Sequence, residues 1–272
     1  MLKTNFTFLV LCFFFILIKI ISISLTDFNL HGDEAQYWLW SKEIDFGYYS
    51  KPPLLAWFVY VICFIFGNSF FVIKMIPIGL YCISSYLIFI LTNMLWRNVG
   101  MALCTATAFF LMPAVTFSSF LLSTDILLVF FWIFGMMQIL KIREAPNLLN
   151  FFLLGFALGM AFLAKYAAIY FVISLILLLI FEKKLSSIFF KNKIGFFLFV
   201  FTTIVILAPN IIWNYNHSWI TFEHTSDNAS LNRINFNFFG GLEFFISQII
   251  MVGPVVVFTF FYYLKKNLKI DF

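Results

Sequence analysis

Chemically capable side chains are concentrated between Asp33 and Pro53, in the stretch DEAQYWLWSKEIDFGYYSKPP. Four of the chain's twelve carboxylates lie there, together with two lysines, two tryptophans and three tyrosines. The adjacent acids Asp33 and Glu34 can divide the work of a proton acceptor and an orienting group, although a solvated pair in a loop would look the same. The aromatic run that begins at Tyr37 suits a helix in the headgroup layer of a membrane. The stretch therefore predicts a site at a membrane–water interface.

Three further charged residues are candidates for the same site. Asp125 opens the apolar run in STDILLVFF, where an acid can also cap free N–H groups and complement the helix dipole. Lys165 is flanked by apolar runs, so its ammonium must reach water, a headgroup or a phosphate, and simple snorkelling would satisfy it equally. Lys51 directly precedes two prolines and could be a phosphate ligand or an interfacial anchor. Acids and lysines at one membrane face indicate a site for an anionic lipid-linked or surface substrate.

Several reaction classes lack their sequence signatures. The chain contains no DxD, GxxxxGK[ST] or GxSxG motif, which argues against nucleotide-dependent chemistry and against a serine hydrolase. His217 and His224, with Glu223 between them, fit no standard zinc spacing, and the four cysteines stand singly in apolar segments. We therefore expect neither a metal nor a cofactor.

The composition defines the kind of fold that must position these residues. The chain is 63% hydrophobic and 11% charged, with a mean hydropathy of +1.02, which excludes a soluble globular domain. Apolar runs recur from end to end, so we expect an all-α, polytopic transmembrane helical bundle. In such a chain the lysines and arginines behind the net charge of +5 mostly determine how the spans are oriented in the membrane. We therefore expect no nucleic acid as a partner.

About eight spans are expected at roughly 20 apolar residues each. Leu54–Phe66 is apolar but short, and we expect it to be re-entrant or interfacial. Residues 151–181 would form a helix of about 46 Å if unbroken, so we expect two spans that meet at Lys165. The expected spans are 6–25, 71–95, 100–118, 124–140, 150–164, 167–181, 194–212 and 241–264.

The charge distribution predicts the orientation of these spans. With a cytoplasmic N-terminus, the segments 26–70 and 213–240 become outer loops, the first of them with interfacial helices. Eleven of the seventeen basic residues then lie inside, and nine of the twelve acids lie outside, as the positive-inside rule expects. The first run carries Lys19 and lacks a small-residue cleavage site, so we expect a retained span rather than a signal peptide.

Five segments together resemble a known family. They are DEAQYWLWSKEIDFGYYSKPPLLAWF, GNSFFVIKMIP, STDILLVFF, GFALGMAFLAKYAA and APNIIWNYNHSWITFEH, in this order along nearly the whole chain. They resemble the GT-C membrane glycosyltransferases that use polyprenyl-phosphate sugars. The branch is the protein O-mannosyltransferase-like one, which includes the lipid A aminoarabinose transferases. The chain departs from the last group at Ser50, because the resemblance implies an acid followed by a lysine at that position in those enzymes. This difference argues against a metal site and against aminoarabinose as the transferred sugar.

The resemblance implies a role for each candidate residue. Asp33 matches the proposed catalytic carboxylate, Glu34 is its partner, and Asp125 matches a second acid. Lys51 and Lys165 match basic residues near the donor phosphate. The substrate-proximal residues are expected to be Tyr37, Tyr166, Trp213, Asn214 and His217.

The resemblance also implies an activity and its partners. We expect transfer of a hexose or pentose from a polyprenyl-phosphate carrier to a protein, lipid A or surface glycan. The expected place is the non-cytoplasmic face of a bacterial inner membrane. Residues 1–272 are interpreted as a single glycosyltransferase-like domain that is C-terminally short for the family, and a separate C-terminal half is a candidate partner. The first alternative is an inactive fragment or a non-catalytic assembly partner. A transporter comes next, but it would predict internal repeats, and the sequence shows no such self-similarity.

Overall fold

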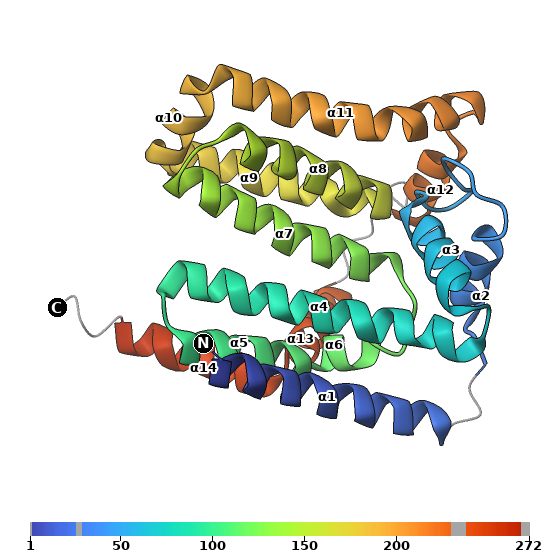
Figure 1. Cartoon of the computed structure of the whole chain (residues 1–272), viewed down its shortest axis with the longest axis horizontal. Coiled ribbons are helices and arrows are strands. Elements are labelled where there is room, and N and C mark those ends of the chain that lie inside the picture. The colour runs from blue at the N-terminus through green and yellow to red at the C-terminus, as the bar shows by residue number, and fades with distance from the viewer. Residues whose placement is uncertain (1, 26–28, 230–237, 268–272) are drawn as a thin grey trace.

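The structure is a computed structural model that describes residues 2–25, 29–229 and 238–267. Over those residues the chain is helical and contains no strand, which confirms the all-α class. Six helices of 13 to 27 residues form most of the body. These are α1 (Leu2–Ser24), α4 (Phe70–Trp96), α7 (Thr124–Glu144), α8 (Leu148–Ala164), α9 (Ile169–Phe181) and α11 (Lys193–Asn216). Figure 1 shows them lying side by side along the long axis of the molecule.

The remaining helices are found at the ends and on one side of this body. They are α2 (Gly32–Trp40), α3 (Leu54–Phe66), α5 (Val99–Leu111), α6 (Pro113–Ser118), α10 (Lys183–Lys191), α12 (Ile220–Ala229), α13 (Phe238–Val252) and α14 (Pro254–Asn267). In Figure 1, α2, α3 and α12 gather at one end of the bundle, whereas α10 lies at the other. We call the first the α2 end and the second the α10 end.

All eight expected spans are helical, but their lengths differ. Within the described residues, four helices are long and apolar enough to cross a membrane, and a bent pair raises the number to five. The four are α1 from Thr7 onward, α4, α7 and α11. The expected spans 100–118 and 241–264 are each two helices, broken at Pro113 and Gly253, because proline lacks an N–H and Gly253 has a φ of +94°. The count of eight stays a prediction.

The structure bears on two expectations about short segments: the break at Lys165 is confirmed, whereas the re-entrant or interfacial placement of Leu54–Phe66 stays a prediction. α3 has 13 residues, too few for a span, and crosses the end of the bundle in Figure 1. The run 151–181 is broken at Lys165, whose φ of −159° and ψ of 135° are extended and end α8. A short 3-10 turn, Tyr166–Ala168, leads from there into α9.

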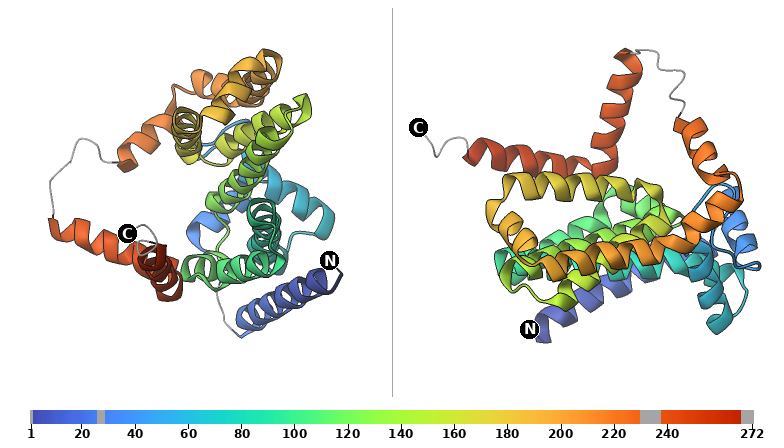
Figure 2. Two further views of the ribbon diagram at one scale, coloured as in Figure 1. Left: turned by 90° about the vertical axis from the view of Figure 1, so that its left-hand side faces the viewer. Right: turned by 90° about the horizontal axis from the view of Figure 1, so that it is seen from above.

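The central contact of the bundle joins α8 to α11 and α7. A Cβ on Gly155 would lie 2.4 Å from the Phe199 carbonyl oxygen, and one on Gly159 would lie 2.9 Å from the Ile206 Cβ. The glycines therefore let two helix backbones approach closely, as the GFALG segment predicts. α12 continues from α11 at the α2 end (Figure 2, right).

Candidate active site

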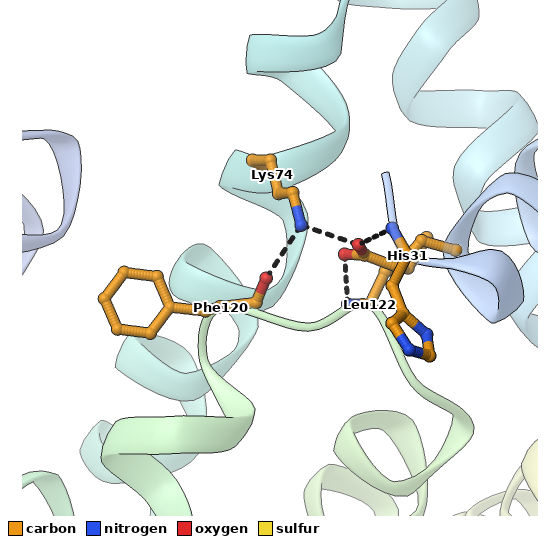
Figure 3. Close-up of polar contacts among 5 residues, drawn as sticks. His31, Lys74, Phe120 and Leu122 are labelled. Atoms are coloured by element: carbon orange, nitrogen blue, oxygen red, sulfur yellow. Dashed lines mark hydrogen bonds and ion pairs between the residues drawn. The ribbon is translucent and has the colours of Figure 1, made fainter. Parts of the chain in front are cut away.

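An ion pair between Glu34 and Lys74 lies buried beneath the N-terminus of α2. The Glu34 Oε2 is 2.6 Å from the Lys74 Nζ and also accepts the His31 backbone N–H at 2.8 Å. The Glu34 Oε1 accepts the Leu122 N–H at 2.9 Å, and the Lys74 ammonium donates to the Phe120 carbonyl at 3.2 Å. Figure 3 shows these contacts converging from three segments. The two charged side chains are only 1% and 7% exposed.

This pair acts as a clamp on the local backbone. Both oxygens of Glu34 have partners, so its carboxylate is enclosed within the protein. It joins the start of α2 to α4 and to the segment before α7. A buried charge persists only when paired and hydrogen-bonded, and here both conditions are met. The clamp thereby fixes the neighbouring Asp33, whose side chain is exposed.

A second ion pair lies on the surface of the α2 end. The Lys165 Nζ is 2.7 Å from the Asp125 Oδ1, with side chains 36% and 52% exposed. Asp125 is in the first turn of α7, where its charge also complements the helix dipole. Lys165 follows the last residue of α8, so the break in the run 151–181 is what brings its ammonium to Asp125.

Tyr37 is affected by the charges of two of these acids. Burial, together with the negative charges of Asp33 and Asp125, raises the pKa of Tyr37 to about 12. Both carboxylates therefore lie near enough to Tyr37 for their charges to act on its hydroxyl. Tyr37 is one turn along α2 from Asp33. The Tyr37 hydroxyl stays protonated and available as a donor at neutral pH. The structure thus brings Asp33, Tyr37, Asp125 and Lys165 together, whereas Glu34 faces the interior.

One hydrophobic cluster underlies all of these residues. It contains Tyr37 of α2, Leu54 of α3, Ile126 of α7 and Ala164 of α8, each at most 5% exposed. These residues lie next to the candidate groups along the chain. The shared core explains why side chains from four helices remain at one level of the bundle.

The loop that carries Lys51 is docked on the end of α11. The Trp213 Nε1 donates to the Asp45 Oδ2 at 2.7 Å, and a Cβ on Gly47 would lie 2.3 Å from the Trp213 ring. Only glycine permits this approach. The Tyr48 hydroxyl lies within hydrogen-bond distance of the Trp40 and Glu43 carbonyl oxygens, at 3.1 and 3.0 Å, and the Tyr48 N–H donates to the Lys51 carbonyl at 3.2 Å. The loop backbone is therefore fixed by Asp45, Gly47 and Tyr48. Among the contacts of the described residues, none that fixes the loop comes from the half-buried Lys51 side chain.

The expected substrate-proximal residues form a second network beside this loop. The Tyr166 hydroxyl donates to the Asn210 Oδ1 at 3.0 Å and accepts from the Asn214 Nδ2 at 3.2 Å. The Asn210 Nδ2 in turn donates to the Phe46 carbonyl at 2.7 Å. These contacts tie the turn after α8 to α11 and to the Lys51 loop. His217, with its Nδ1 2.7 Å from the Trp213 carbonyl oxygen, is exposed at the same end.

Two cavities lie among α1, α2, α3 and α4, and one of them adjoins the clamp. One of about 350 Å³ lies between α1, α2 and α4, lined by Asn29, His31 and the Glu34–Lys74 pair among apolar residues. The other, also about 350 Å³, is an apolar groove between α3 and α4 with Ile62 and Met75 in its walls. Apolar grooves next to polar groups at one end of a bundle suit a lipid chain with a charged head.

Comparison with known proteins identifies the family of this chain. A family model described as dolichyl-phosphate-mannose-protein mannosyltransferase matches residues 50–213. The chain belongs to this family. The lipid A galacturonosyltransferase RgtD of Rhizobium johnstonii is 30% identical to it over 257 residues, 93% of this chain and 52% of the relative. The chain thus spans about half the length of that relative, and no solved structure matches.

The family assignment confirms the resemblance and makes the chain a member of a membrane glycosyltransferase family. The matched residues 50–213 include Lys51, Asp125 and Lys165. Within the described part of the chain, no three histidine, cysteine or acidic residues are grouped as metal ligands would be.

Sequence reasoning missed Lys74 and Asn210 in this mannosyltransferase-family chain. Lys74 was counted as part of an apolar span, although it is a charge near the start of such a span and needs a partner. Asn210 is only 2% exposed and directly follows Pro209 in the last third of the long helix α11. A buried amide next to a helix-breaking residue was the available signal.

Proposed function

We propose that the chain transfers a sugar from a polyprenyl-phosphate carrier to an acceptor hydroxyl, at the membrane face on which the α2 end lies. The observation that carries the proposal is the position of the exposed Asp33 carboxylate. Asp33 directly precedes the clamp residue Glu34, and its charge acts on Tyr37 together with that of Asp125, the acid paired with Lys165. Membership in a glycosyltransferase family supports the reaction class.

The proposed reaction is a single displacement at the anomeric carbon. The acceptor oxygen forms a bond to C1 of the sugar while the bond from C1 to the carrier phosphate oxygen breaks. The proton of the acceptor hydroxyl passes to the Asp33 carboxylate, which acts as the base. The polyprenyl phosphate leaves with the bonding electron pair, and the configuration at C1 inverts.

The lysines stabilise the departing phosphate. Lys165 uses one of its three donors on Asp125 and retains two for a phosphate. Lys51 extends from a loop whose backbone is already fixed. Preorganised cations of this kind supply much of the catalysis in such steps. The polyprenyl chain would lie in the apolar groove between α3 and α4.

The relative RgtD, named a lipid A galacturonosyltransferase, favours lipid A or a similar glycolipid as the acceptor. The lysines of the α10 end favour a cytoplasmic location for that end, under the positive-inside rule. The α2 end would then face the periplasm of a bacterial inner membrane.

The test is a transfer assay in membranes with labelled polyprenyl-phosphate sugar and lipid A. Asp33→Asn and Lys165→Ala are each expected to lower the transfer rate by on the order of a hundredfold. Glu43→Gln is the matched control, because Glu43 is an exposed acid of the same loop. Near-normal turnover in both variants would refute the assignment. Absence of transfer by the unmodified chain would favour the alternative of a non-catalytic partner.

A further inference from the structure

The α10 end carries an amphipathic helix that crosses the bundle axis. The segment Tyr166–Phe181 and α10 meet at an angle of 105°. α10 packs Leu185 and Phe189, 1% and 0% exposed, into a cluster with α8 and α11. Its lysines are exposed on the opposite side. A short helix with buried apolar residues and outward lysines at the end of a span is typical of the membrane interface.

Three of the lysines at this end line one groove of about 840 Å³. Lys184 and Lys191 come from α10, and Lys193 begins α11. Ser187 and Asn192 add a hydroxyl and an amide to the same groove. Among the residues that the structure describes, none of the three lysines is within 4.0 Å of an acid. The nearby Glu182 is already engaged by Arg143 and by the Leu185 N–H.

Large apolar side chains remain exposed beside the groove. Phe190 is 62% exposed, Ile194 69% and Phe197 65%. Ile194 also lines the groove, so its apolar wall continues along α11 toward the middle of the bundle. Cationic groups at a groove mouth and apolar groups along its continuation match the two parts of a phospholipid.

We infer that this groove binds an anionic phospholipid of the leaflet opposite to the candidate active site. The lipid phosphate lies between Lys184, Lys191 and Lys193, and an acyl chain follows Ile194 and Phe197. The positive-inside rule alone explains lysines at this end, but it does not require three of them to share a cavity. Lys141 and Lys183 provide the contrast, because they lie at the same end and do not line the groove.

The test is native mass spectrometry of the full chain in detergent with added phosphatidylglycerol, phosphatidylcholine or inorganic phosphate. The wild type is expected to retain one phosphatidylglycerol in preference to phosphatidylcholine. Lys184→Gln with Lys191→Gln is expected to weaken retention about thirtyfold, because each lysine near an anionic headgroup contributes about fivefold. The matched control, Lys141→Gln with Lys183→Gln, removes the same charge from the same end and should retain the lipid.

Each other outcome would overturn the inference. Equal loss in both double variants would mean that net charge, not the groove, holds the lipid. Equal retention in both would mean that the groove lysines do not bind it. Binding of phosphate without any preference for phosphatidylglycerol would mean that the groove accepts a free anion instead of a lipid. Thermal unfolding of all variants in the same detergent verifies that they remain folded.

Discussion

The two ion pairs of the α2 end differ in burial and therefore in what they can do. Glu34–Lys74 has side chains 1% and 7% exposed, and every oxygen of the acid has a partner. Asp125–Lys165 has side chains 52% and 36% exposed and a single contact. A buried pair with satisfied hydrogen bonds holds structure together, whereas an exposed pair contributes little to stability and remains open to a ligand. The α2 end thus contains one ion pair that holds the local backbone in place and one that is open to contact with a substrate.

Breaking the buried pair should have the largest effect. Lys74→Met leaves the Glu34 carboxylate buried without its cation, which is expected to lower the free energy of unfolding by about 3–5 kcal/mol. Chemical denaturation in detergent measures this loss. Adding Glu34→Gln removes the other charge and keeps an acceptor oxygen for one of the two backbone N–H groups, so part of the stability should return. A single variant as stable as the wild type would contradict the clamp.

Breaking the exposed pair should separate activity from stability. Asp125→Asn is expected to change the free energy of unfolding by less than about 1 kcal/mol. Because Asp125 orients Lys165, the transfer rate should still fall by roughly tenfold to a hundredfold. Paired measurements of turnover and denaturation test this.

The control for that experiment is Arg143→Gln. It breaks the other exposed ion pair, Arg143–Glu182 at 3.3 Å, which lies at the α10 end. Neither activity nor stability should change appreciably. If Arg143→Gln lowered the transfer rate as much as Asp125→Asn, the effect could not be assigned to the candidate site.

The smallest effect concerns Tyr37, on which the charges of Asp33 and Asp125 both act. Its pKa is about 12 in the fold, against about 10 in an unfolded chain, so it binds its proton more tightly when folded. Its contribution to stability is present below pH 10 and is lost as the pH rises toward 12. Tyr37→Phe should therefore flatten the decline in unfolding free energy over that range.

Much of the helical framework follows from local sequence. The length of 54–66 showed that it is too short for a span, and the charge of Lys165 located the break between α8 and α9. These features depend on hydrophobic length and on the cost of burying a charge, both of which are visible in a single segment.

The partners across the fold did not follow from sequence. Glu34 and Lys74 are separated by 40 positions, and the Trp213–Asp45 contact by 168. Such contacts depend on how helices pack, which hydrophobic length does not specify. The same limit applies to Lys19, which sequence placed within the first span. In the structure it donates to the Thr116 carbonyl and lies 3.6 Å from the Phe120 ring centroid.

The Glu34 clamp also constrains the order in which the protein can be assembled. A ribosome delivers Glu34 before Lys74, and Lys74 before Leu122, so the acid is exported from the ribosome with neither partner yet made. An unpaired carboxylate cannot remain in an apolar environment at low cost. The stretch that begins at Asp33 must therefore stay in contact with water at least until Lys74 has been synthesised. The contact with Leu122 forms later still, so the α2 end is completed well after Glu34 itself has been translated.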